Sequence, residues 1–298
     1  MPTAQMAHTN GIELCYETFG DADGEPLLLV MGIGAQLIVW PVELCDALAD
    51  RGFHVIRYDN RDVGLSTKLA DMAGGFLPAF LAAVQGEPVD VPYLLSDLAA
   101  DAVGLLDALG IDAAHVVGAS MGGMIAQTMA IEHRSRVRTL TSIMSTTGEP
   151  DVGQPTPAAV ERLLQPPPAN RDAAIAAGVE ARRILGSPDE FDEERARALV
   201  TQSYDRCYHP AGSARQLLAV AASGSRADGL RQLDISTLVI HGDADPLVTP
   251  SGGIRTAELV PGARLLMVEG MGHDLPAAHL GPIVEAITAL AAGRPAAT

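Results

Sequence analysis

Five residues, Gly118-Ala119-Ser120-Met121-Gly122, constrain the fold of this chain more than any other stretch. They follow a short apolar run at 114–117 and precede a helix-like stretch that begins at Gly123. A strand, a glycine-flanked serine and a helix in this order predict a sharp turn that strains the serine backbone and projects its hydroxyl away from the sheet. A side chain at either glycine would collide with the neighbouring strand or helix. The first amides of the helix and the positive end of its dipole would lie beside the serine, where they suit a developing oxyanion.

Strand-like and helix-like stretches alternate along most of the chain. Alternating or continuously apolar runs predict strands at 12–19, 27–31, 54–58, 114–118, 137–144, 237–241 and 264–268. The segments between them predict helices at 41–51, 93–109, 123–133, 251–260 and 281–292. The run 27–31 is apolar throughout, which is typical of a strand buried on both faces of a parallel sheet. This order predicts an α/β fold with a mostly parallel sheet covered by helices on both faces.

Residues 147–230 depart from this alternation. They contain Pro155, Pro157 and a triple proline at 166–168, together with helical stretches near 171–185, 192–206 and 211–222. We expect 147–230 to form an all-helical cap on a core made of 1–146 and 231–298. The cap would roof the serine, and the alternative is a packed extension without a gating role. Residues 67–92 form a second long connection, of the kind that borders pockets.

A serine nucleophile needs a base, and the base needs a carboxylate that orients it. His273 follows directly on the strand that ends at 268, among small and flexible residues, and is predicted to be the base. The loop after the strand 237–241 offers two carboxylates, Asp243 and Asp245. We choose Asp245 because Pro246 disfavours a helical backbone there and stabilises a projecting turn. Asp243 is the alternative acid, or it simply caps the turn.

An oxyanion hole needs two N–H donors. The amide of Met121, immediately after the serine, is predicted to be one of them. The amide of Ile33, in the loop after the strand 27–31, is predicted to be the other. Gly32 and Gly34 keep that loop open, and we expect both of them and Gln36 to border the bound substrate.

The bulk composition narrows the range of partners. A formal net charge of −17 would repel a phosphate backbone, so no nucleic acid is expected. The cysteines Cys15, Cys45 and Cys207 are widely spaced and form no metal-ligand pattern, so neither a metal nor a cofactor is expected. The first residues lack the pattern of a signal peptide, and no apolar run approaches ~18 residues. We therefore expect a cytoplasmic protein that has no membrane partner; the sequence carries no signal of its oligomeric state.

Four motifs resemble the α/β-hydrolase superfamily, over nearly the whole chain. They are Gly-Ala-Ser-Met-Gly at 118–122, Asp-x-Arg-x-x-Gly-x-Ser at 59–66, Gly-Asp-Ala-Asp-Pro at 242–246 and Gly-Met-Gly-His at 270–273. The resemblance implies the α/β-hydrolase fold: a mostly parallel, twisted sheet flanked by helices, with an all-helical cap inserted after the sixth strand. Met31 departs from the usual His of the oxyanion loop, and Asp62 from the usual Gly of the second motif.

Two shorter observations refine this resemblance. Segments 30–32, 40–41 and 57–62 look like the aclacinomycin methylesterases of this superfamily, which hydrolyse a methyl ester on an anthracycline side ring. That likeness covers the core motifs and not the cap. The turn-rich segment 59–66 is interpreted as a support that knits the loops beside the site by hydrogen bonds and ion pairs, with no part in the chemistry.

Together these features predict a serine-type carboxylic ester hydrolase that works through an acyl-enzyme on a small hydrophobic ester. A methyl ester of a hydrophobic or ring-bearing molecule is the favoured substrate class. Similar triads also serve cofactor-free perhydrolases (haloperoxidase-type enzymes), C–C bond hydrolases and lactonases, which are the alternatives among enzymes. Serine in place of aspartate at residue 120 argues against dehalogenase and epoxide hydrolase chemistry. A ligand-binding protein of the same fold is the alternative outside enzymes.

Overall fold

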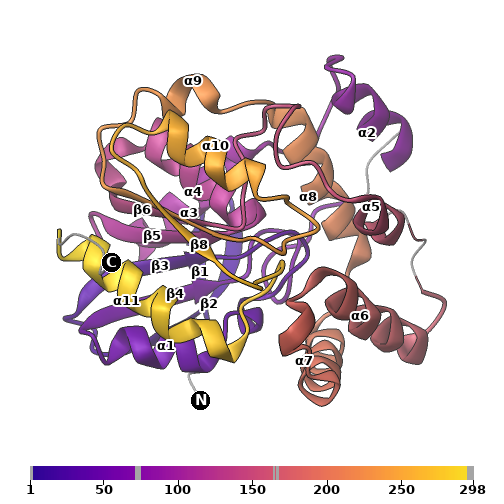
Figure 1. Cartoon of the computed structure of the whole chain (residues 1–298), viewed down its shortest axis with the longest axis horizontal. Helices are drawn as coiled ribbons and strands as arrows, with labels where there is room; N and C mark the ends of the chain where they lie inside the picture. Colours follow the sequence, from indigo (N-terminus) through magenta and orange to yellow (C-terminus); the bar gives the residue numbers. More distant parts are fainter. Residues whose placement is uncertain (1–2, 71–74, 164, 166–167, 294–298) are drawn as a thin grey trace.

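The computed structural model of the chain describes residues 3–70, 75–163, 165 and 168–293. Within them, eight strands form one sheet in the order β1-β2-β4-β3-β5-β6-β7-β8 (Figure 1). The pairs β1–β2 and β2–β4 are antiparallel, and all the later neighbours are parallel. The strands are β1 Gln5–Thr9, β2 Ile12–Phe19, β3 Glu25–Val30, β4 Phe53–Tyr58, β5 Ala114–Ala119, β6 Val137–Ile143, β7 Thr237–Gly242 and β8 Arg264–Val268.

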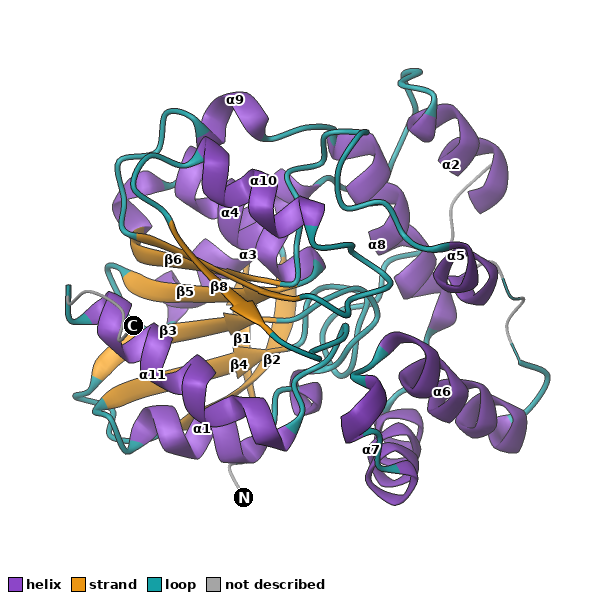
Figure 2. Cartoon of the chain, in the orientation of Figure 1, coloured by secondary structure: helices purple, strands orange, loops and turns teal. Residues whose placement is uncertain are grey.

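Helices cover both faces of this sheet (Figure 2). Leu27 and Leu29 of β3 belong to a core cluster shared with α1 Val42–Ala49 and α11 Leu280–Ala291. Leu28 and Val30 belong to the cluster on the opposite face, shared with α3 Leu95–Ala108, α4 Met121–Glu132 and α10 Ser251–Leu259. Successive side chains of a strand point to opposite faces, so the continuous apolar run of β3 supplies both clusters. The predicted strand with two buried faces is confirmed.

Four helices stand to one side, beyond the ends of the parallel strands that carry the site loops (Figure 1). They are α5 Pro157–Leu163, α6 Arg171–Leu185, α7 Glu193–Arg206 and α8 Pro210–Ser223. These four helices, with the described residues that join them, are called the cap from here on. The side chains of Asn170 and Asp192 accept hydrogen bonds from backbone amides in the first turns of α6 and α7, which explains where those helices begin. A small apolar cluster of Ile175, Val179 and Ala196 holds α6 against α7.

Several elements lie outside the predicted set. They are β1, α2 Phe76–Val84, α5, α9 Ala227–Leu230 and the short 3-10 helices at Leu37–Val39, Arg134–Arg136, Pro188–Glu190 and Ala277–His279. The long connection 67–92 thus contains a helix, which packs on α8. Leu230 of α9 is buried in the main core beside α4 and α10, although it lies within the range predicted for the cap. The cap range 147–230 stays a prediction, and Pro166 and Pro167 of the triple proline lie outside the described residues.

Candidate active site

Ser120 lies at the sharp turn between β5 and α4. Its backbone has φ 56° and ψ −122°, a conformation that residues other than glycine rarely adopt. Its amide donates to the carbonyl of Ile143 in β6 over 2.9 Å. A Cβ on Gly118 would overlap the backbone of Gly122, and a Cβ on Gly122 would overlap the carbonyl of Val30. The two glycines therefore let β5, α4 and β3 approach closely enough to hold the strained serine.

His273 and Asp245 lie with Ser120 in one relay of hydrogen bonds. The three residues follow β8, β7 and β5, so their loops meet at the same edge of the parallel sheet. His273 Nε2 is 3.0 Å from Ser120 Oγ, and His273 Nδ1 is 2.8 Å from Asp245 Oδ2. A nucleophile, a base and an orienting carboxylate need this order and these distances. The structure brings together the three residues selected from the sequence, and their catalytic roles are taken up below as a proposal.

The Asp245 carboxylate is held by its own turn. Oδ1 accepts hydrogen bonds from the amides of Leu247 (2.9 Å) and Val248 (3.0 Å), which leaves Oδ2 for His273. Because a carboxylate only accepts, His273 Nδ1 must carry a proton, and Nε2 is then free to accept one from the serine. The alternative acid, Asp243, accepts a hydrogen bond from the amide of Gly270 over 2.8 Å and so holds the histidine loop.

The loop after β3 passes beside the serine. A Cβ on Gly32 would lie 3.0 Å from Ser120 Cβ and 3.4 Å from Ser120 Oγ, so this stretch of backbone contacts the nucleophile. Ile33 is the next residue along the loop. Met121 is the first residue of α4, where backbone amides have no acceptor within the helix. Both amides predicted for the oxyanion hole thus belong to segments that adjoin Ser120.

Gln36 is engaged with the cap. Its Nε2 donates to the carbonyls of Ser203 (2.6 Å) and Cys207 (2.8 Å), and its Oε1 accepts from Arg206 Nη1 (2.7 Å). Gln36 is only 4% exposed. Its polar atoms therefore hold the end of α7, and the substrate-binding role expected for Gln36, like that of Gly32 and Gly34, stays a prediction.

The segment 59–66 supports the surrounding loops by hydrogen bonds and an ion pair, as its sequence predicts, whereas its lack of a part in the chemistry stays a prediction. Asp59 accepts hydrogen bonds from the amides of Leu37 and Leu65 and pairs with Arg206 of α7 at 2.7 Å. The side chain of Asn60 donates to the carbonyl of Met31, directly before Gly32 (2.9 Å). These contacts fix the loops after β3 and β4, which lie on one side of the strand that carries the nucleophile.

Asp62 explains one departure from the family pattern. It has φ 70°, the left-handed conformation that favours the glycine usual at this place. Its carboxylate accepts two hydrogen bonds from Arg215 of α8, each 2.8 Å, and one from the hydroxyl of Tyr93. Burial opposes ionisation of Asp62, but these bonds and one from the Leu69 amide outweigh it and lower its pKa. An aspartate therefore keeps the backbone shape and adds an ionic link to the cap.

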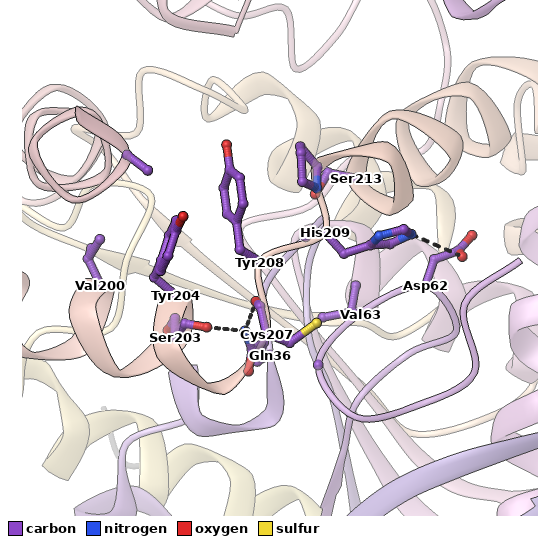
Figure 3. Close-up of a pocket in the computed structure, with 14 residues that line it drawn as sticks. Gln36, Asp62, Val63, Val200, Ser203, Tyr204, Cys207, Tyr208, His209 and Ser213 are labelled. Atoms are coloured by element: carbon purple, nitrogen blue, oxygen red, sulfur yellow. Dashed lines mark hydrogen bonds and ion pairs between the residues drawn. The ribbon is translucent and has the colours of Figure 1, made fainter. Parts of the chain in front are cut away.

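A cavity of about 220 Å³ lies between the cap and the core loops. Tyr204 and Tyr208 line it with stacked rings whose centroids are 4.6 Å apart. Figure 3 shows both rings beside the Gln36 contacts, with His209 turned toward Asp62. Gly34 is also part of the wall, so the cavity adjoins the loop that passes Ser120. Ser120, Asp245 and His273 do not line this cavity.

Two wider features of the described residues bear on function. Across them, no group of three or more His, Cys, Asp and Glu side chains is placed to hold a metal ion. None of the helices in the same part of the chain is long and apolar enough to cross a membrane.

Cys15, Cys45 and Cys207 are free thiols, and burial is the main cause that raises the pKa of Cys15 to about 11 and that of Cys45 to about 12.

Sequence reasoning missed the cap residues that contact the site loops. Gln216 of α8 accepts a hydrogen bond from the amide of Gly34. The carbonyl of Leu185 accepts one from the amide of His273 (2.7 Å), and the hydroxyl of Ser187 accepts one from the amide of Gly272 (2.9 Å). No motif surrounds these residues, because their partners are backbone groups more than 80 positions away. Only the three-dimensional fold reveals them.

The fold and this site define a class of protein. The family model described as alpha/beta hydrolase fold matches residues 25–277, and the chain belongs to this family. The predicted fold and superfamily are thereby confirmed.

Particular relatives support the narrower resemblance. The chain is 32% identical to the rhodomycin D methylesterase DauP of a Streptomyces species (strain C5), over 97% of this chain and 98% of that protein. It is equally similar to the rhodomycin D methylesterase DnrP of Streptomyces peucetius, with the same identity and coverage. Among solved structures, a meta-cleavage product hydrolase of Pseudomonas fluorescens superposes with a TM-score of 0.75 at 21% identity, covering 96% of each chain. An enol-lactonase of Burkholderia xenovorans gives a TM-score of 0.75 at 22% identity, covering 96% of this chain and 99% of its own. At these identities the two structures show the fold alone.

Proposed function

We propose that this protein is a carboxylic ester hydrolase that cleaves a methyl ester of a hydrophobic, ring-bearing substrate through an acyl-enzyme. The observation that carries the proposal is the relay from Ser120 through His273 to Asp245, with contacts of 3.0 and 2.8 Å. The full-length likeness to two methylesterases supports the ester as the substrate class. The stacked rings of Tyr204 and Tyr208 in the neighbouring cavity support a ring-bearing substrate.

In the first half of the reaction, His273 Nε2 takes the proton of the Ser120 hydroxyl as Oγ attacks the ester carbonyl carbon. A new C–O bond forms, and the carbonyl electron pair moves onto oxygen. The amides of Met121 and Ile33 stabilise this oxyanion. Asp245 holds His273 in the tautomer with a proton on Nδ1 and stabilises the imidazolium that results.

In the second half, the tetrahedral intermediate expels the alcohol. His273 gives its Nε2 proton to the departing oxygen, so a methyl ester releases methanol and leaves the acyl group on Ser120. Water then attacks the acyl carbon while His273 takes a proton from it. Collapse of the second intermediate returns that proton to Ser120 Oγ and frees the carboxylic acid.

The cap and the cellular location belong to the same proposal. The cap, 147–230 in the sequence prediction, would roof the substrate through α6, α7, α8 and the segment 207–209 between α7 and α8, which together provide most of the cavity wall. A cytoplasmic location is supported by the three free thiols, which suit a reducing compartment.

The test is hydrolysis of 4-nitrophenyl esters from acetate to decanoate, and of methyl esters of aromatic acids, by the wild type and by Ser120→Ala. We expect wild-type activity that falls at least ~10³-fold in Ser120→Ala. Ser96→Ala, which changes a serine hydrogen-bonded to Glu132 on the surface, is the matched control and should retain activity. Equal activity in wild type and Ser120→Ala, or none on any ester, would contradict the proposal.

A further inference from the structure

We propose that Gln216 is a positioning residue for the oxyanion hole, through which a cap helix fixes the backbone loop beside Ser120. The inference rests on the proposed function, because it assigns this loop to the oxyanion of an acyl-transfer reaction. It concerns a residue outside the sequence motifs, located in α8, far along the chain from the loop that it holds.

The contact itself is direct, and its Gln216 side is fully buried. Gln216 Oε1 accepts a hydrogen bond from the amide of Gly34 over 2.8 Å. Gln216 Nε2 donates to the carbonyl of Arg61 over 2.8 Å. Gln216 is 0% exposed, so neither its Oε1 nor its Nε2 can exchange its partner for water without opening the junction between α8 and the core. One carboxamide thus bridges the loop after β3 and the loop after β4.

The far end of this bridge is firmly fixed. The guanidinium of Arg61 makes two hydrogen bonds of 2.6 Å to the carboxylate of Asp101 in α3. Both side chains are nearly inaccessible to solvent. Burial works against the charge on Arg61, but the bonds to Asp101 outweigh it and raise the pKa of Arg61. Gln216 therefore links the Gly34 amide to the backbone of Arg61, which the Arg61–Asp101 pair holds in the core.

The oxyanion loop is held at both ends. Asn60 binds the carbonyl of Met31 (2.9 Å) before the loop, and Gln216 binds the amide of Gly34 after it. Gly32, which contacts Ser120, and Ile33, whose amide is the proposed donor, lie between these two anchors. Misplacement of a catalytic group by about 1 Å can cost roughly a factor of 10² in rate, so the second anchor matters for the chemistry.

Packing closes the loop against α8. Gly34 has φ 64°, and a Cβ on it would overlap the hydroxyl of Ser213. The loop backbone at Gly34 therefore lies directly against the side chain of Ser213 in the first turn of α8. A shift of α8 would move Gly34 with it, which makes the cap a part of the oxyanion hole's support.

The experiment measures kcat and KM of Gln216→Met and of the wild type. The concentration of active sites, from which kcat is calculated, is determined by complete labelling with a fluorophosphonate. Met keeps the volume and removes both hydrogen bonds. We expect kcat to fall about 10- to 100-fold and KM to change less than about threefold. The affinity for phenylboronic acid, which forms a tetrahedral adduct on Ser120, should weaken by the same factor as kcat.

Two further variants separate positioning from stability. Ser223→Ala removes another link from α8 to the core, the bond that Ser223 Oγ accepts from the amide of Leu95 (2.9 Å), and should leave kcat per site unchanged. Gln216→Glu reproduces both bonds only while its carboxyl is protonated, so its kcat relative to wild type should fall as pH rises.

The outcomes are distinct from those that test the proposed function. Unchanged kcat per site in Gln216→Met, or a loss carried by KM alone, would overturn the positioning role even if the melting temperature drops. A wild type without esterase activity would instead contradict the proposed function. The boronate affinities would then still decide whether Gln216 shapes an oxyanion site, since equal values in wild type and Gln216→Met would refute it.

Discussion

The two oxygens of the Asp245 carboxylate are used differently. Oδ1 accepts two backbone amides of its own turn, and Oδ2 accepts the proton on His273 Nδ1. The first oxygen fixes the rotamer, so the second is presented to the imidazole without freedom to turn away. This division explains why the carboxylate that precedes a proline, and not its neighbour Asp243, reaches the histidine.

We predict that Asp245→Asn lowers kcat by roughly 10³–10⁴ and leaves the fold intact. The asparagine oxygen would keep the bonds from Leu247 and Val248, so its NH₂ group would face His273 Nδ1. A donor there favours the imidazole tautomer with its proton on Nε2, which cannot take the proton of Ser120. Steady-state kinetics on a 4-nitrophenyl ester, with thermal melting of both proteins, measure the effect. Asp243→Asn is the matched control and should keep its activity, and a loss there with full activity in Asp245→Asn would show that the wrong acid was chosen.

Among secondary-structure elements, the sequence predicts those that have a clear hydrophobic periodicity or a capping residue at their end. The helix predicted at 171–185 is found at Arg171–Leu185, because Asn170 caps its start. β1 was missed because it is short, lies at the sheet edge and buries only Ala7 and Thr9. α2 was missed because Pro78 and surrounding apolar residues give no helical stripe; only packing on α8 defines it.

The candidate site likewise contains residues that the local sequence predicts and others that it does not. The serine turn and the residues that follow β7 and β8 are specified by local chemistry, so Ser120, Asp245 and His273 could be selected from the sequence. Gln216 could not be selected, because its role depends on contacts between the cap and the backbone of distant loops. Gln36 was placed on the correct loop, yet its partners in α7 are invisible to any pattern within that loop.

The ion pair between Asp59 of the loop 59–66 and Arg206 of α7 leads to a prediction about the free energy of unfolding. Asp59 is 0% exposed and pairs with Arg206, which is also largely buried. Burial is the largest influence on Asp59 and raises its pKa, while Arg206 acts in the opposite direction. We predict that Arg206→Met lowers the free energy of unfolding at pH 7.5 by about 3–5 kcal/mol, because the carboxylate is left buried without its partner.

The pH dependence of that loss follows from the sign of the shift. A carboxyl with a higher pKa in the folded state binds its proton more tightly there, so the free energy of unfolding falls as pH rises through the shifted range. Removing Arg206 raises the folded pKa further, so Arg206→Met should lose more stability at pH 7.5 than at pH 5. Urea unfolding at both values measures this. The double variant Asp59→Asn/Arg206→Met should recover part of the loss, and an equal deficit at both pH values would contradict the explanation.

In the molecule as a whole, the cap is joined to the core at the loop after β3 and at the histidine loop. Gln216 holds the oxyanion loop, and Arg215 pairs with Asp62 beside it. At the histidine loop, the carbonyl of Leu185 accepts from the amide of His273, and Ser187 donates to the carboxylate of Asp274 (2.6 Å). The Arg215–Asp62 pair is buried, and the other three contacts are partly buried. Lifting the cap as a rigid lid would therefore disturb the loops of the proposed site, so we expect substrate access and the geometry of that site to be coupled.

The coupling predicts that cap and core unfold in one cooperative transition, even though the helices of the cap have a small apolar cluster of their own. Trp40 is the only tryptophan of the chain and is fully buried in the core, so its fluorescence reports the core alone. Far-UV circular dichroism reports all the helices, including α6, α7 and α8. We expect the urea midpoints of the two signals to coincide in the wild type. A wild type that loses helix signal before Trp40 fluorescence would show that the cap unfolds independently, and the cap would then be free to move without disturbing the relay.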